Sequence, residues 1–154
     1  MYDLWLFLHI LGAIVAFGFG FYAPLFGTMT AREPQHGNWY MRSSQRLSSL
    51  VLVPVAISMA ITGTLLVVET CGTQRFRELW LALSLILYVV ALLIVFLAQR
   101  PTLGKAIALS AGPPGPEGPS AELPGLIRRM QLYGVVLLIL VIAIVALMIW
   151  KPLL

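Results

Sequence analysis

Residues 4–21 read LWLFLHILGAIVAFGFGF, an apolar run that contains one histidine, His9. A helix needs about 20 apolar residues to cross the hydrocarbon core of a bilayer. The run continues to residue 26 without Asp, Glu, Lys or Arg, and three more uncharged stretches follow it. The sequence therefore predicts four membrane spans, at residues 4–26, 47–68, 79–98 and 131–150.

The composition agrees with a membrane protein. Of 154 residues, 60% are hydrophobic and 10% are charged, against about 25% charged residues in an ordinary soluble domain. Too little polar surface remains to cover four buried helices in water. We expect an all-α fold, in which residues 1–154 form a single four-span bundle with up-down-up-down topology. The first run is too long for a signal peptide and has no basic residue before it, so it is interpreted as a retained span.

The charges predict an orientation. Because the number of spans is even, both termini lie on one side, and the first and third loops lie on the other. Those two loops hold seven of the ten basic residues. The positive-inside rule places the first and third loops in the cytoplasm and both termini outside. The seven basic residues are Arg32, Arg42, Arg46, Arg100, Lys105, Arg128 and Arg129. Their predicted partner is anionic lipid rather than nucleic acid, because they are spread over separate loops.

The third loop includes residues 111–125, AGPPGPEGPSAELPG. Its prolines and glycines cannot hold a helix, so we expect a flexible hairpin there. Cys71 is the only cysteine in the chain, which excludes an internal disulfide.

Small residues surround the histidine of the first span. Gly12, Ala16 and Gly20 recur every four residues, and His9 lies three positions before Gly12. Residues spaced by three and four share one face of a helix. Since membrane helices associate through small residues and polar contacts, this face is predicted to meet the neighbouring helices. The imidazole would then point into the bundle and away from lipid.

Other polar residues are expected near His9. At about 1.5 Å per residue, His9 lies roughly 7–8 Å below the outer boundary. The same depth on the second and third spans falls at Thr62 and Ser84, and Tyr88 follows one turn deeper. Pro54 should bend the second span, because a proline removes one backbone donor from the helix. His9, Thr62, Ser84 and Tyr88 are therefore the predicted lining of a cofactor or ligand pocket.

Several roles for His9 stay open at this stage. The ring could hydrogen-bond a neighbouring helix, ligate the iron of haem b, contact a quinone or other redox ligand, or transfer protons. Two histidine ligands from one chain are excluded, because the other histidine, His36, lies in the first loop. A haem would need Met148, a second subunit or a vacant axial position.

Familiar catalytic patterns are absent from the sequence. It contains no Gly-Lys-Ser/Thr phosphate loop, no His-Glu-x-x-His metal site and no Gly-x-Ser-x-Gly nucleophile. The sequence therefore contains none of these motifs for hydrolysis or for nucleotide-driven activity. No catalytic residue is predicted, and the sequence does not decide whether the protein is an enzyme.

Four short segments carry a family resemblance: LWLFLHILGAIVAFG, TGTLL, LWLALSLILY and MIWKP, in this order. Together they resemble the small integral membrane proteins grouped as domain of unknown function 2269. The resemblance covers nearly the whole chain. It implies four spans and a bacterial inner membrane, and it supplies no activity.

A more distant resemblance concerns His9, YAPLF at residues 22–26 and Lys151–Pro152. These features are similar to the haem-binding membrane protoporphyrinogen oxidases, in which the first-helix histidine is implicated in haem binding. The resemblance implies that role for His9. The chain lacks two cations of that family, one within the YAPLF segment and one shortly after Trp80.

Three functions follow as hypotheses. The first is an accessory or scaffold subunit of a larger membrane complex, respiratory or photosynthetic, because the fourth span, VVLLILVIAIVALMIW, suits lipid or a partner's flank. The second is a haem- or redox-ligand-binding membrane protein that uses His9. The third is an enzyme like protoporphyrinogen oxidase. The first is the favoured prediction.

Overall fold

The computed structural model describes residues 1–32, 34–71, 78–111 and 122–150. Over these residues the chain is helical, without strands. Three short segments have 3₁₀ or π geometry: η1 (Pro34–His36), η2 (Ser48–Leu52) and η4 (Ile94–Gln99). The α-helices are α1 (Tyr2–Arg32), α2 (Gly37–Leu47), α3 (Val53–Cys71), α4 (Leu79–Leu93), α5 (Arg100–Ser110) and α6 (Leu123–Trp150).

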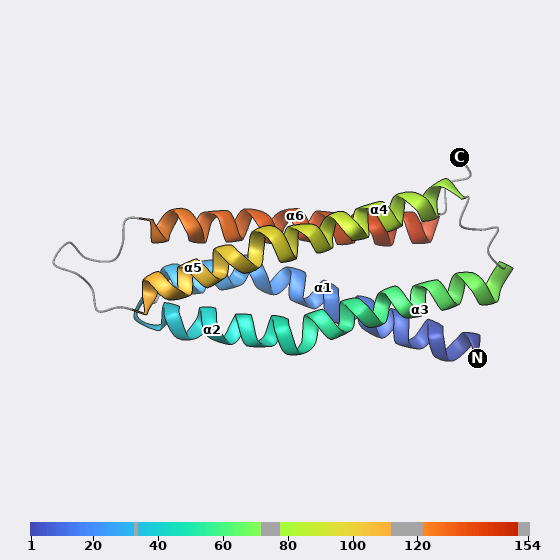
Figure 1. Cartoon of the computed structure of the whole chain (residues 1–154), viewed down its shortest axis with the longest axis horizontal. Helices are drawn as coiled ribbons and strands as arrows, with labels where there is room; N and C mark the ends of the chain where they lie inside the picture. The colour runs from blue at the N-terminus through green and yellow to red at the C-terminus, as the bar shows by residue number, and fades with distance from the viewer. Residues whose placement is uncertain (33, 72–77, 112–121, 151–154) are drawn as a thin grey trace.

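These elements form four long rods. They are α1, the continuous segment α2–η2–α3, the continuous segment α4–η4–α5, and α6. Each rod contains a helix long and apolar enough to cross a membrane. Successive rods run in opposite directions, so that α1 begins and α6 ends at the same end of the bundle (Figure 1). The predicted all-α, up-down-up-down bundle of four spans is confirmed.

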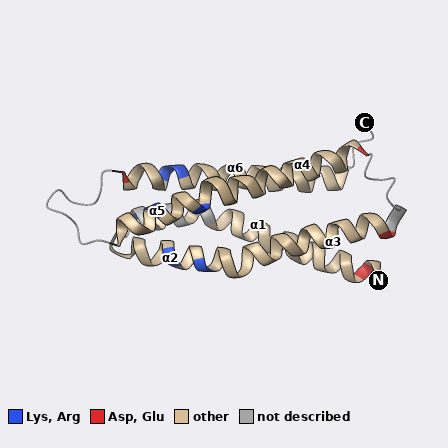
Figure 2. Cartoon of the chain, viewed as in Figure 1, with Lys and Arg blue, Asp and Glu red and all other residues tan. Residues whose placement is uncertain are grey.

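The helices extend well beyond the predicted spans at the basic end of the bundle. Segments expected to be loops form the end of α1, α2 up to its last residue, all of α5 and the first two turns of α6. The physical reason is a small apolar core, in which Met41, Leu103 and Ala106 are 1%, 9% and 0% exposed. The predicted spans end at the first charged residue, whereas an amphipathic helix can include charged residues on its exposed face. The span prediction therefore did not include these helices. Figure 2 shows the described Lys and Arg residues at this end.

The predicted flexible hairpin at residues 111–125 is partly wrong. Helix α6 begins at Leu123, so Pro124 and Gly125 lie in its first turn. Proline is tolerated there, because the first N–H groups of a helix have no partner within the helix. Residues 112–121 lie outside the described residues.

Two of the interior prolines, Pro54 and Pro101, have the same local backbone geometry before them. The π segment η2 ends at Leu52, two residues before Pro54, and η4 ends at Gln99, two residues before Pro101. A proline lacks the N–H of the ordinary i to i−4 bond, and its ring collides with that carbonyl. A wider π turn shifts the bonding to i−5 and moves the carbonyl aside. The bend expected at Pro54 is thus accompanied by a π turn just before it.

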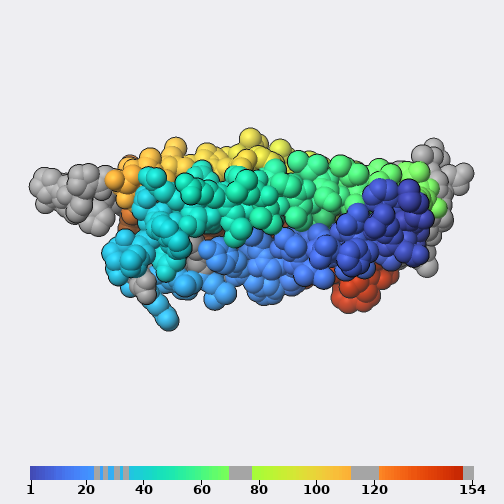
Figure 3. Space-filling view, turned by 90° about the horizontal axis from the view of Figure 1, so that it is seen from below, coloured from blue at the N-terminus to red at the C-terminus, as the bar shows by residue number. Residues whose placement is uncertain are grey.

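Helix α1 lies between two neighbours. It packs against α3 on one side and α6 on the other, and α4 packs against α6. Figure 3 shows α1 running along the α2–α3 rod. At the basic end α2 meets α5, but no Cα atom of α3 lies within 8 Å of one of α4. We call this separation the α3–α4 seam.

The glycines of α1 allow close approach to both neighbours. A Cβ added at Gly12 would lie 2.7 Å from Cγ of Met59 on α3. A Cβ added at Gly20 would lie 3.1 Å from Cδ1 of Leu138 on α6. The small-residue stripe therefore contacts two helices rather than one.

We expect Gly12→Ala to destabilise the bundle by about 1–3 kcal/mol, because the added methyl group overlaps Met59. The matched control is Gly18→Ala, where an added Cβ meets nothing within 4 Å. Equilibrium unfolding of both variants in one mild detergent measures the difference. Equal stability of the two variants would contradict the described packing of α1 on α3.

Candidate functional site

His9 joins the first two spans. Its Nδ1 lies 3.1 Å from Oγ1 of Thr62 on α3, and Thr62 is only 3% exposed. The imidazole is therefore turned into the bundle, as the stripe of small residues predicts. Of the predicted site residues, Thr62 is the one that the structure brings into hydrogen-bond contact with His9.

A glycine next to Thr62 makes room for the ring. A Cβ added at Gly63 would lie 3.1 Å from Cε1 and 3.6 Å from Nδ1 of His9. The imidazole thus lies against the backbone of α3, and no larger residue fits at this position without moving it. The sequence analysis did not identify this role. A glycine between two threonines in a membrane span was the available signal.

The hydrogen bonds favour one tautomer of the ring. The hydroxyl of Thr62 donates to the Ser58 carbonyl at 2.8 Å. Since a threonine hydroxyl has one hydrogen, its oxygen then accepts from Nδ1–H of His9. This pattern leaves Nε2 with its lone pair, able to accept a hydrogen bond or bind a metal. The ring also forms a hydrogen bond with the backbone of Met59 on α3.

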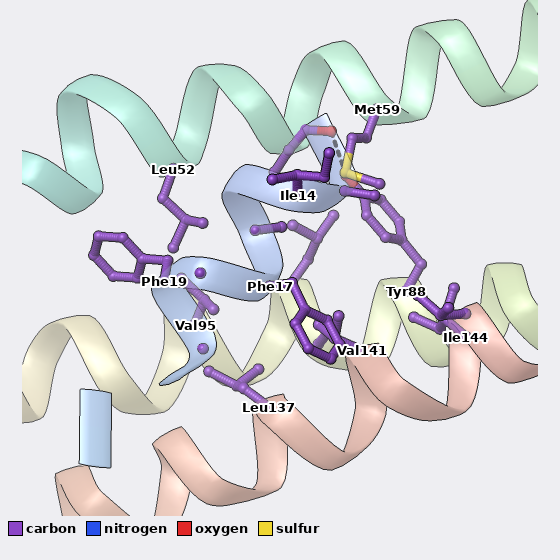
Figure 4. A pocket seen from close by; sticks show the side chains of 18 of the residues that line it. Ile14, Phe17, Phe19, Leu52, Met59, Tyr88, Val95, Leu137, Val141 and Ile144 are labelled. Atoms are coloured by element: carbon purple, nitrogen blue, oxygen red, sulfur yellow. Dashed lines mark hydrogen bonds between the residues drawn. The ribbon is translucent and has the colours of Figure 1, made fainter. Parts of the chain in front are cut away.

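The other two predicted residues behave differently. Ser84 is 3% exposed, but its hydroxyl donates to the Trp80 carbonyl within α4, at 2.8 Å. Tyr88 donates its hydroxyl to the Ala56 carbonyl on α3. This bond crosses the α3–α4 seam (Figure 4). Of the three residues predicted at one depth, His9 and Thr62 are therefore in contact, whereas Ser84 bonds its own helix.

A cavity of about 750 Å³ lies within the bundle. Ligand pockets commonly measure about 300–1,000 Å³, whereas protein interiors normally pack without such voids. All four rods contribute to its wall, including Phe17, Leu52 and Val141 (Figure 4). His9 and Tyr88 are among the lining residues, but Thr62 and Ser84 are not.

The cavity is long and has polar groups at its two ends. Its lining on the second rod runs from Ser44 to Met59, which corresponds to about 22 Å at the rise of an α-helix. His9 and Tyr88 lie toward one end. At the other end are Ser44, Ser48, Gln99 and Arg100. The sequence analysis did not group these four residues, because it took residues 44, 99 and 100 to lie in loops outside the spans.

The fit of a haem can be judged from the charges. Nε2 of His9 suits an axial ligand, and Met148 lines the same cavity. Haem, however, has two carboxylates that need cationic or hydrogen-bonding partners. The described Lys and Arg residues lie toward the opposite end of the bundle, and the described charged residues nearest the His9 end are acidic (Figure 2). They are Asp3, Glu69 and Glu78. The described residues therefore do not fit haem well.

Other metal sites are not visible either. No group of three or more His, Cys, Asp or Glu side chains able to hold a metal ion occurs within the described residues. Among the described residues, His9 therefore offers one ring nitrogen as a possible metal ligand, next to the apolar cavity.

These features define an integral membrane four-helix bundle with an internal apolar cavity. Residues 3–152 match the family described as "Predicted integral membrane protein (DUF2269)", and the chain belongs to this family. No curated protein and no solved structure matches the chain. The predicted resemblance to the protoporphyrinogen oxidases receives no support from these comparisons.

We expect the His9–Thr62 contact to contribute about 0.6–2 kcal/mol, the range for polar contacts between membrane helices. A double-mutant cycle with His9→Phe and Thr62→Val measures this coupling by equilibrium unfolding. The matched control for the second variant is Thr64→Val, because Thr64 bonds only its own helix, at the Ala60 carbonyl. A coupling near zero, equal to that of a cycle with Thr64→Val, would contradict the contact.

Proposed function

We propose that this protein binds a long-chain amphiphile with a hydroxyl-bearing ring inside its bundle, the chemical class to which isoprenoid quinols belong. The observation that carries this proposal is the cavity, which is apolar along its length and has His9 and Tyr88 toward one end. It favours the redox-ligand role of His9 over the haem role, because a quinol head has no carboxylates to pair.

Each part of such a ligand finds a complementary surface. A ring hydroxyl can donate to Nε2 of His9, whose lone pair stays available while Nδ1 bonds Thr62. The hydroxyl group of Tyr88 donates its hydrogen to the Ala56 carbonyl, and its oxygen can still accept a hydrogen bond. An extended apolar chain would lie along Phe17, Leu52 and the other lining residues of the bundle interior. The α3–α4 seam is the proposed route of entry from the bilayer.

Filling the cavity should remove the ligand. We expect Ala56→Phe to lower the quinol retained after purification in mild detergent at least about tenfold, because Ala56 lines the cavity. Ala60→Phe is the matched control, since Ala60 lies one turn away on an exposed surface of α3. Organic extraction followed by mass spectrometry measures the retained quinol, and size-exclusion chromatography shows that both variants are folded.

Two further variants test the contact with the ring. His9→Phe should weaken binding of an added short-chain quinol, whereas His36→Phe should not. A Soret band in wild-type protein that disappears in His9→Phe would instead establish the haem role. Wild-type protein that retains and binds no quinol would contradict the proposal.

The orientation and location also belong to this proposal. Membership of the family establishes a membrane protein, and the basic end of the bundle suggests which end faces the cytoplasm of a bacterial inner membrane. In a Cys71→Ser background, Glu69→Cys, at an exposed position of α3, should be labelled by an impermeant maleimide added to intact spheroplasts. In the same background, Glu122→Cys should be labelled only after the membrane is opened. The reverse result would invert the proposed orientation.

The accessory-subunit hypothesis stays a prediction. An apolar outer face suits acyl chains as well as a partner helix, so the described surfaces do not distinguish them. Co-purification of a second membrane polypeptide in a fixed ratio would support this role, and a solitary chain by native mass spectrometry would argue against it.

A further inference from the structure

The second polar set lies at the end of the cavity away from His9, and we call it the basic end of the cavity. Its members are Ser44, Ser48, Gln99 and Arg100. Ser44 and Ser48 are one turn apart on the second rod, and Gln99 and Arg100 are adjacent where η4 continues into α5. Hydroxyl, amide and guanidinium groups all carry hydrogen-bond donors.

Arg100 has donors to spare. Its Nη2 donates to Oγ of Ser49 at 2.6 Å, and its guanidinium carbon lies 5.2 Å from the ring centroid of Phe96. No ion pair to a carboxylate is seen for Arg100 within the described residues. Because a guanidinium group has five N–H donors, several remain for an anion.

The position of Arg100 along the chain indicates the source of that anion. It is the first charged residue after the uncharged run at residues 79–98. It therefore lies at the boundary of the predicted span, where phospholipid phosphates are found. Arg128, at the same end of the bundle, is exposed and does not line the cavity. Arg100 is partly buried, and its side chain joins the interface to the apolar space.

We propose that the basic end of the cavity binds the head group of an anionic phospholipid, with one acyl chain lying in the cavity toward His9. The phosphate would accept hydrogen bonds from Arg100, and the serine hydroxyls would contact the remaining oxygens. Charge complementarity and the continuity of the polar end with an apolar space about 22 Å long support this occupant. The proposal does not rest on the proposed function, because the head group binds at the opposite end of the cavity. The acyl chain and a quinol chain would occupy the same apolar space, so the two ligands would compete for it.

Lipid titration of the purified full chain tests this site. Phosphatidylglycerol should bind wild-type protein more tightly than phosphatidylcholine, by native mass spectrometry or thermal shift in one detergent. Arg100→Gln should weaken phosphatidylglycerol binding at least about tenfold, the effect of losing a charge-assisted hydrogen bond. The control is Arg128→Gln, which makes the same change in net charge and should bind as wild type does.

Several outcomes would overturn the proposal. One is an equal loss of binding in Arg100→Gln and Arg128→Gln, which would indicate a diffuse surface effect. Another is unchanged binding in Arg100→Gln. Inorganic phosphate that binds alone as tightly as the lipid would assign the site to a free anion.

A second variant serves if Arg100→Gln does not fold. Ser48→Ala removes one hydroxyl from the basic end and leaves the charge unchanged, and it should weaken phosphatidylglycerol binding about threefold. Folded Ser48→Ala that binds phosphatidylglycerol as tightly as wild type does would contradict the proposal. Wild-type protein that shows no preference for phosphatidylglycerol over phosphatidylcholine would contradict it as well.

Discussion

One hydrogen bond, from His9 on α1 to Thr62 on α3, sets the arrangement of the membrane-level bundle. Lipid tails are as apolar as leucine, so helices in a bilayer gain little by hiding apolar side chains from them. Polar contacts and close backbone approach decide which helices meet. Gly63 lets the imidazole lie against α3, and Gly12 lets the same two helices approach at Met59. Helix α1 is thereby held between α3 and α6, while α3 and α4 stay apart.

The same reasoning explains why the bundle is tightly packed at one end and hollow along its length. Met41, Leu103 and Ala106 are buried where α2 and α5 extend past the uncharged runs. In water, exposing such residues costs free energy, and the helices pack closely. At membrane level an apolar space can be filled by a chain from the bilayer at little cost, so the cavity need not collapse. Tyr88, bonded to the Ala56 carbonyl, bridges the seam without closing it.

The sequence predicts the bundle well and the site in part. The inward direction of His9 was predictable, because a helical period of 3.6 residues places it on the glycine face. The level of Thr62 was predictable from the rise per residue. The same count also selected Ser84 as pocket lining, but its hydroxyl bonds the Trp80 carbonyl of its own helix and it does not line the cavity, because depth along a helix says nothing about direction. Arg100 was expected to meet anionic lipid, but its place in the cavity wall was not predicted, because its contact with Ser49 depends on helices that the count of uncharged residues does not reveal.

The ring of His9 provides the most direct test of the account. Solid-state NMR of ¹⁵N-histidine protein in lipid bilayers reports which ring nitrogen carries the proton, and the His36→Phe variant leaves His9 as the sole signal. The account predicts a neutral ring protonated at Nδ1, with that proton close to the Thr62 side chain, and a changed signal in Thr62→Val. A ring protonated only at Nε2, or one in contact with acyl chains and indifferent to Thr62→Val, would contradict it.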